Sequence, residues 1–354
     1  MKQLFRFLFA VSALFAMVGC DSVDTLSSSK KTSQGSPYEL LVVCNGREWE
    51  SELGAELRAA LEKPVEVLNQ VEPTFDVVRI THRDFKHLLP SYRNIIKVIC
   101  SSEVAQTSMI AKYDEVATPQ IVVTFQGPSV EAMTDYLKAN GAKLCQVLEE
   151  AERDRSVDIA KQKGADDVEK KIYDKFGMDL AVPTDYQVRS ESDDMLWVSQ
   201  EFPTASQGFF IYKYPYKGKE SLSVESLMKA RNKFAARIPG PAEGSYMSTV
   251  DEIPDDTGEE YMPYIPEYRT LLIGERPWVE MSGLWDVENY FMGGPFVSYT
   301  TVNKLTNEVV TIDCYVYYPT AYNKSPEKRN KLRALQHLVY LADFPAAKKV
   351  EAEQ

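Results

Sequence analysis

The sequence is poor in the residues that most often carry catalysis. Its three histidines are His82, His87 and His337, and none are four apart, the spacing of a helical metal-binding pair. It has no Gly-x-Ser-x-Gly elbow for a serine nucleophile. A histidine triad built from distant residues stays open, because such partners meet in space. We therefore expect a protein that is not an enzyme and holds no metal or cofactor.

Cysteine is also sparse, and its spacing fits no zinc or redox motif. No Cys-x-x-Cys pair occurs among Cys20, Cys44, Cys100, Cys145 and Cys314. Cys44 and Cys100 each end a predicted buried strand and Cys314 lies inside one, which favours free buried thiols. An oxidising compartment would also permit a Cys44–Cys100 disulfide if their strands are neighbours.

Positive charge and long apolar runs are scarce as well. The chain has 40 Lys and Arg against 52 Asp and Glu, a net charge of −12. An acidic protein is repelled by nucleic acid and by anionic lipid headgroups, so we expect no nucleic-acid partner. Beyond the first 20 residues, no apolar stretch reaches the roughly 20 residues that span a bilayer.

The N-terminus does have the pattern of a bacterial lipoprotein signal. Lys2 and Arg6 precede an apolar run over 8–18, and Met-Val-Gly-Cys at 17–20 supplies the lipid-attachment thiol. Cys20 would carry diacylglycerol, and its freed amine a further acyl chain such as palmitate, which together anchor stably. Met17 stands where Leu is commoner, and the alternative is an ordinary secretory signal with an incidental cysteine. We expect a lipid-anchored cell-envelope protein, on the outer membrane or a periplasmic face.

The composition divides the chain into six segments. Residues 1–19 are the signal peptide, and 20–37 are the lipidated cysteine and a Ser-rich flexible tether. An N-terminal α/β domain over 38–142, a charged helical connector over 143–178 and a C-terminal α+β domain over 179–345 follow. The last segment, 346–354, is a disordered tail. The overall class is α+β, with two sheet-plus-helix halves.

Hydrophobic periodicity predicts the elements of both halves. In the first half we expect strands at 39–44, 75–80, 94–99 and 120–125, and helices at 50–61 and 130–139. In the second half we expect an antiparallel sheet with a hairpin over 296–318 that turns at 303–307. Helices are predicted at 222–234, capped by Ser221 or Ser223, and at 325–342.

The connector is dominated by charge. Val168, Ile172 and Phe176 recur every four residues, Gly164 is a break, and Gly177 suits a helix C-cap. We expect one or two long exposed helices, which serve either as a partner-binding arm or as a solvated link.

Two local motifs favour structural roles. The acidic run over 251–260 lacks the alternating ligands of a calcium loop, so a solvated loop is expected. Met-Gly-Gly-Pro-Phe at 292–296 has no following Lys and Ser or Thr, which favours a tight turn or bulge over a phosphate cradle.

Four stretches of the second half resemble a known family. They are Phe-Ile-Tyr-Lys-Tyr-Pro at 210–215, Ile-Pro-Gly-Pro at 238–241, Gly-Leu-Trp-Asp-Val at 283–287 with the 292–296 motif, and Tyr-Val-Tyr-Tyr-Pro at 315–319 followed by Lys328-Arg329. With the signal, they resemble uncharacterised envelope lipoproteins of Bacteroidetes-type bacteria, classed as a domain of unknown function. The resemblance covers nearly the whole mature chain. It implies a two-part α/β lipoprotein, and neither an activity nor a site residue.

These patterns support three hypotheses of function. The first is a non-catalytic envelope protein that binds a protein partner or helps to assemble an envelope component. The second is a small-molecule or glycan-binding protein, since aromatic rings stack on sugar faces. Its candidate contact residues are Tyr212, Tyr214, Tyr216, Trp278 and Trp285. The third is a hydrolase that uses carboxylates such as Asp286 and Glu288.

Cys20→Ala tests the anchor. Because the mature chain is acidic and has no second long apolar run, we expect the variant to leave the membrane fraction as a folded, soluble protein. Fractionation of cells followed by a high-salt wash measures this. Retention of the variant in washed membranes would show that another anchor exists.

Overall fold

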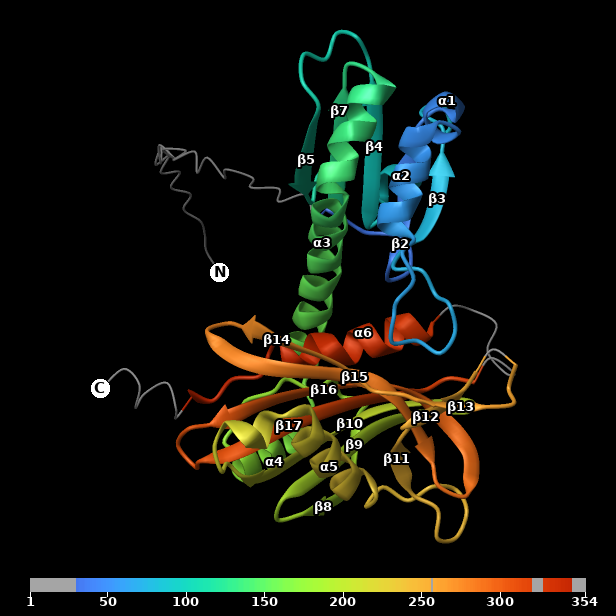
Figure 1. The fold of residues 1–354 in the computed structure, drawn as a ribbon. Coiled ribbons are helices and arrows are strands. Elements are labelled where there is room, and N and C mark those ends of the chain that lie inside the picture. Colours follow the sequence, from blue (N-terminus) through green and yellow to red (C-terminus); the bar gives the residue numbers. More distant parts are fainter. Residues whose placement is uncertain (1–29, 256, 320–326, 346–354) are drawn as a thin grey trace, which may run out of the picture.

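The computed structural model describes residues 30–255, 257–319 and 327–345. The predicted signal peptide, Cys20 and the tail over 346–354 lie outside these ranges. Within them the fold is α+β, as predicted: a smaller, mainly parallel sheet with its helices stands on a larger antiparallel sheet (Figure 1).

The N-terminal half is built on a five-stranded sheet in the order β3-β2-β4-β7-β5. The first four of these strands are parallel, and β5 is antiparallel to β7. Helix α2 and the start of α3 cover one face, with Leu53 and Leu57 in the core between them and the sheet. The elements are β2 Glu39–Val43, α1 Gly46–Trp49, α2 Glu52–Leu61, β3 Asp76–Ile80, η1 Leu89–Ser91, β4 Asn94–Cys100, β5 Ser108–Tyr113 and β7 Ile121–Gly127. The predicted strands and helix of this half are confirmed, and β5 was not foreseen.

Ordered structure begins inside the predicted tether. β1, Lys31–Thr32, pairs in parallel with β6, Ala117–Thr118. The Gln34 backbone then binds a second segment, because its N–H donates to Ser91 O at 2.8 Å and its carbonyl accepts from Arg93 N. The expectation of a flexible segment up to residue 37 is therefore wrong from Lys31 onward, since backbone hydrogen bonds satisfy this polar sequence.

Helix α3 runs unbroken over Val130–Gln162, where a helix over 130–139 and a separate exposed connector were expected. Its charged middle is partly buried: Glu152 is 2% and Arg155 6% exposed. Glu152 accepts from Asn94 at 2.6 Å and forms an ion pair with Arg93 at 2.6 Å. The predicted exposure of this charged segment is wrong here, because these charged groups pair with residues at the beginning of β4 and are not solvated.

The helix that was predicted after the break at Gly164 is confirmed. Helix α4, Asp166–Phe176, buries Val168, Ile172 and Phe176. It ends at Gly177, whose φ of 63° is the left-handed C-cap conformation that glycine adopts without strain.

The C-terminal half is an eight-stranded antiparallel sheet in the order β11-β15-β16-β17-β10-β9-β8, with β14 on the same edge of β15 as β11. Its strands are β8 Gln187–Ser192, β9 Met195–Phe202, β10 Ala205–Pro215, β11 Met247–Thr249, β14 Glu267–Ile273, β15 Arg276–Val287, β16 Tyr290–Asn303 and β17 Glu308–Tyr317. The predicted hairpin at 296–318 is confirmed as β16–β17. The motif at 292–296 lies inside β16, so the tight-turn alternative is wrong. The bulge alternative is supported at its first residue: Asp286 pairs with Gly293 and Val287 with Tyr290, which leaves Phe291 and Met292 as extra residues on β16.

Two cores lie on opposite faces of this sheet. Ile211 packs in the core with α4 and α6, whereas its neighbour Tyr212 packs in the core with α5, as strand alternation requires. Helix α5, Val224–Ala235, is capped by Ser223, and α6 is Lys328–Val339. A short 3₁₀ turn, η2 Lys219–Leu222, precedes α5. The acidic run contributes to a small hairpin of β12 Glu252–Pro254 and β13 Tyr261–Pro263.

Helix α6 joins the two halves. The Glu72 carboxylate, from the loop before β3, accepts from the α6 backbone N–H groups of Lys328 and Arg329, the latter at 2.7 Å. The fully buried Arg329 guanidinium then donates to Pro73 O and to Asp76 Oδ2, at 2.5 and 2.7 Å. A carboxylate at a helix N-terminus satisfies orphan N–H groups and complements the helix dipole. The N-terminal half therefore caps a helix of the C-terminal half, and we call this contact the interdomain joint.

A buried ion pair fixes α5 on the sheet. Arg231 and Asp313 are both fully buried, and Arg231 Nε donates to Asp313 Oδ2 at 2.9 Å. Ser298 also donates to this carboxylate, and Thr249 accepts from the guanidinium at 2.7 Å. The guanidinium carbon lies 3.5 Å from the centre of the Phe296 ring. Burial raises the pKa of Asp313, so its charge depends on these partners.

Asp313→Asn should destabilise the fold by about 3–5 kcal/mol, because it leaves the Arg231 charge buried without its counter-ion. The double variant Arg231→Met/Asp313→Leu should lose clearly less, since it removes both charges. Urea unfolding followed by circular dichroism measures both. Asp174→Asn is the matched control: it breaks an exposed pair with Lys170 and should cost less than about 1 kcal/mol. Equal losses for Asp313→Asn and Asp174→Asn would contradict the prediction.

Candidate functional site

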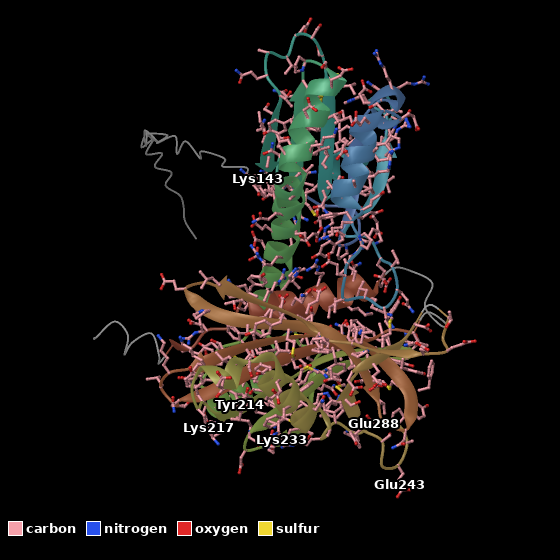
Figure 2. The ribbon with its side chains drawn as sticks, in the orientation of Figure 1. Lys143, Tyr214, Lys217, Lys233, Glu243 and Glu288 are labelled. Carbon is pink, nitrogen blue, oxygen red and sulfur yellow. The ribbon has the colours of Figure 1, made fainter. Side chains whose placement is uncertain are left out.

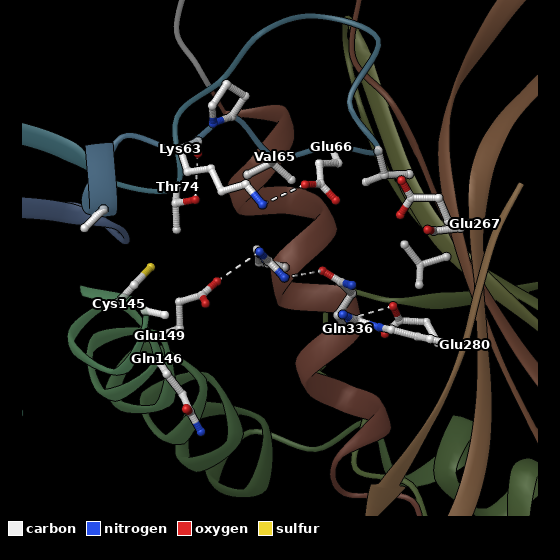
Figure 3. Close-up of a pocket in the computed structure, with 18 residues that line it drawn as sticks. Lys63, Val65, Glu66, Thr74, Cys145, Gln146, Glu149, Glu267, Glu280 and Gln336 are labelled. Atoms are coloured by element: carbon white, nitrogen blue, oxygen red, sulfur yellow. Dashed lines mark hydrogen bonds and ion pairs between the residues drawn. The ribbon is translucent and has the colours of Figure 1, made fainter. Parts of the chain in front are cut away.

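A polar cleft lies where the two halves meet. It consists of two adjoining cavities of about 320 and 240 Å³ that share lining residues. Helices α3 and α6, strands β14 and β15 and the loop after α2 surround it (Figure 3). We call it the interdomain cleft, and its polar lining comprises Lys63, Glu66, Gln146, Glu149, Glu267, Arg269, Glu280, Arg333, Gln336 and His337.

Ion pairs cross and border the cleft. Arg333 of α6 contacts Glu149 of α3 at 2.9 Å, which connects the two halves. Arg269 of β14 pairs with Glu280 of β15 at 2.7 Å (Figure 3). The Arg269 side chain is 70% exposed, whereas that of Glu280 is 9% exposed. Arg269 therefore offers a guanidinium to solvent at the mouth of the cleft.

Helix α6 provides a row of polar groups on the floor. Gln336 Nε2 donates to the Tyr299 hydroxyl at 3.0 Å, and Arg333 donates to Gln336 Oε1 at 3.4 Å. His337 Nε2 lies 3.3 Å from the Tyr38 hydroxyl, across the boundary between the halves. Its Nδ1 and Arg333 Nε are buried without a hydrogen-bond partner in the described part of the chain.

The cysteine and the histidine of the cleft are held neutral. Burial raises the pKa of the Cys145 thiol to about 12, and nearby Glu149 adds to the effect. Burial lowers the pKa of His337 to about 3, helped by the positive charges of Arg333 and Arg153. A thiol nucleophile needs its thiolate, and a histidine needs a pKa near the working pH for general acid–base chemistry. The arrangement therefore suits recognition of a polar partner by charge and hydrogen bonds.

The five predicted aromatic contact residues do not form one exposed surface. Tyr212 and Trp285 lie in the core beneath α5, each 1% exposed, and Trp278 lies in the core on the other face of the sheet. Tyr214 stacks on Tyr212 and is half-buried, and Tyr216 follows the end of β10. Large rings at alternating strand positions become core here because helices cover both faces of the sheet.

The predicted acids lie elsewhere. Asp286 accepts from the Ser248 hydroxyl at 2.5 Å, and Glu288 is exposed in the turn between β15 and β16. Neither lines the interdomain cleft. Asp255 of the acidic run accepts hydrogen bonds from Thr257 and from backbone N–H groups of its own turn.

The described residues outside the cleft were compared with the requirements for a disulfide, a metal site and a membrane-spanning helix. Cys44, directly after β2, and Cys100, at the end of the neighbouring strand β4, are free thiols. Across residues 30–255, 257–319 and 327–345, no group of three or more His, Cys, Asp or Glu is placed to hold a metal ion. No helix within those ranges has the length and apolarity to cross a bilayer.

The sequence did not predict the cleft, because its charged residues lie on elements whose composition is typical of solvent-exposed segments. Leu332 and Leu335 mark the apolar face of α6, and Arg333 and His337, four residues apart, form a neighbouring polar stripe. His337 is buried although it belongs to this stripe. The spacing of Arg333 and His337 beside the apolar face was the available signal, and it did not indicate that His337 is buried.

Comparisons with known proteins divide the chain in two. Residues 165–340 match a family model described as a domain of unknown function (DUF4837), and residues 33–161 match another domain of unknown function (DUF8532). These matches support the assignment to an uncharacterised domain family. They meet between α3 and α4. No curated protein matches the chain in sequence.

Solved structures show only weak similarity to this chain. The Ran-binding protein Mog1p of Saccharomyces cerevisiae and a point mutant of the protein Mog1 are each 11% identical, with a TM-score of 0.28. Each comparison covers 48% of this chain and 90% of the other. At that TM-score the likeness carries no argument about fold or function.

His337 makes stability dependent on pH. Its folded-state pKa is about 3 against an ordinary value of 6.5, so the unfolded chain takes up a proton that the folded chain refuses. Its contribution to the free energy of unfolding is complete above pH 6.5. This contribution should decrease by about 1.4 kcal/mol per pH unit as the pH falls toward 3. Urea unfolding at pH 7, 5.5 and 4.5 should show a smaller acid loss for His337→Gln than for the unsubstituted protein.

His87→Asn is the control for this experiment, since His87 is exposed and asparagine tolerates its φ of 61°. It should follow the unsubstituted protein at every pH. If His337→Gln shows the same pH profile as the unsubstituted protein, His337 is not the group responsible.

Proposed function

We propose that this protein is a lipid-anchored, non-catalytic factor of the bacterial cell envelope that binds a protein partner in the interdomain cleft. The observation that carries the proposal is the chemistry of the cleft. Its accessible groups are charged and of both signs, while Cys145 and His337 are held neutral.

The anchor rests on the N-terminal sequence. The apolar run and Met-Val-Gly-Cys at 17–20 support lipidation of Cys20. A basic surface does not offer an alternative means of membrane attachment, since the mature chain would keep 38 Lys and Arg against 52 Asp and Glu. The folded body would then stand off the membrane on the short polar segment that precedes Lys31.

The cleft lining favours a protein partner. Small-molecule sites are mostly apolar with a few polar groups, whereas Lys63, Glu66, Glu267 and Arg269 make the mouth of this cleft strongly polar. Mixed charges at the rim of a protein interface contribute specificity and association rate. A partner segment with charges of both signs could pair with the exposed side chains of Arg269, Lys63 and Glu66.

A photo-crosslinking amino acid placed at Glu267 tests this proposal in intact cells. Glu267 is exposed at the mouth of the cleft, so we expect crosslinks to one reproducible envelope protein. The same amino acid at Lys233 is the control, because α5 lies on the far side of the C-terminal sheet (Figure 2). Arg269→Glu should weaken the Glu267 crosslink several-fold, and Lys233→Glu should not. Recovery of no reproducible partner from Glu267, or of the same partner from both positions, would refute binding in the cleft.

A further inference from the structure

A second cavity lies on the opposite face of the eight-stranded sheet. It measures about 360 Å³, near the lower end for small-molecule sites. We call it the indole pocket, and its main walls are Trp197, Ile238, Met247, Trp285, Met292 and Tyr315. All six belong to, or pack against, the core beneath α5. The cleft residues Val297 and Tyr299 belong to the other core, so the sheet separates the two sites.

The walls of the pocket are held by the fold. Strand β15 pairs with β16 up to Asp286, with Trp285 opposite Gly294, and β16 pairs with β17 from Phe296 onward, opposite Tyr315. A Cβ on Gly294 would lie 2.1 Å from Val316 O and 3.3 Å from Trp285 Nε1, so only glycine allows this close approach. The loop after α5 adds Pro239 and Pro241, whose rings restrict the backbone.

One wall residue of the pocket has a buried polar group without a partner in the described part of the chain. Trp285 is 1% exposed, and its Nε1 makes no hydrogen bond to any described residue. The neighbouring indole differs, because Trp197 Nε1 donates to the Tyr315 hydroxyl at 2.8 Å. A buried N–H without an acceptor costs free energy that a bound acceptor restores.

From these observations we propose that the indole pocket is a binding site for a small, largely apolar ligand that carries a hydrogen-bond acceptor. The apolar part packs between the aromatic rings and the two methionines, whose flexible thioethers adapt to varied shapes. The acceptor receives the hydrogen bond of Trp285 Nε1.

The rim of the pocket indicates which end of the ligand is polar. Glu201 Oε1 accepts from Ser199 and Ser206, and Arg189 Nε donates to Ser199 at 2.9 Å. Oε1 of this carboxylate is thereby occupied by hydroxyl donors, and the Arg189 side chain is exposed. Arg189 is the group of this rim that an anionic group of the ligand would pair with.

Binding of 1-anilinonaphthalene-8-sulfonate to the full chain tests the proposal, because this probe combines aromatic rings with an anionic acceptor. We expect saturable binding of one probe per chain and quenching of tryptophan emission by energy transfer. The NMR signal of the Trp285 indole N–H, assigned by its loss in Trp285→Phe, should shift on addition of the probe.

Variants locate the binding. Met292→Trp fills the pocket and should weaken binding at least about tenfold. Trp285→Phe keeps an aromatic wall but removes the donor, and should weaken binding about two- to tenfold, the value of one hydrogen bond. Thr270→Trp is the control, since it adds the same ring at the separate cavity beside β14 and should bind the probe normally. Near-ultraviolet circular dichroism must show native packing in each variant, because partly unfolded proteins also bind this probe.

Absence of saturable binding, or normal binding by a folded Met292→Trp, would overturn the proposal. The proposal would also be overturned if the Trp285 N–H signal did not shift when the probe is bound. This shift is measured on the unsubstituted protein, so it does not depend on the folding of a variant. These outcomes are independent of the interdomain cleft, whose crosslinks are measured on the other face of the sheet.

Discussion

The placement of the two halves depends on one carboxylate at the end of a helix. Glu72 accepts from two backbone N–H groups at the start of α6, and Arg329 from the same turn reaches back to Pro73 and Asp76. Each half therefore completes the hydrogen bonding of the other. Burial raises the pKa of Glu72, and the two α6 amides counteract that shift, so the charge is tolerated because the helix end is there.

The interdomain cleft is a product of this joint. With α6 fixed by its first turn, Arg333 lies one turn further along, opposite Glu149 of α3, and His337 a further turn along, beside Tyr38. The cleft lining thus comes from segments that are far apart in the sequence. The same sheet that supports the cleft carries the indole pocket on its other face, because successive strand residues point to opposite sides.

Much of the fold could be predicted from local patterns. The β16–β17 hairpin, the Gly177 cap and the Ser223 cap all followed from residues close in sequence. The site and the other buried polar contacts could not be predicted, because His337 in the cleft and Arg155 and Arg231 outside it are polar residues whose burial is decided by distant partners. Periodicity identifies an apolar face, and it does not tell whether a charge beside that face meets water or a carboxylate from another element. The burial of the aromatic residues has the converse reason, since helices on both faces make Trp278 and Trp285 part of the core.

The joint also sets an order of assembly. Glu72 and Arg329 are separated by 257 positions, so the contact requires nearly the whole polypeptide. A chain that is synthesised from its N-terminus onward can form the parallel sheet early, since those strands and α2 precede residue 130. Helix α6 emerges almost last. Until it does, the loop that contains Glu72 has no helix to cap, and a truncated product would keep a folded first half that is unable to dock.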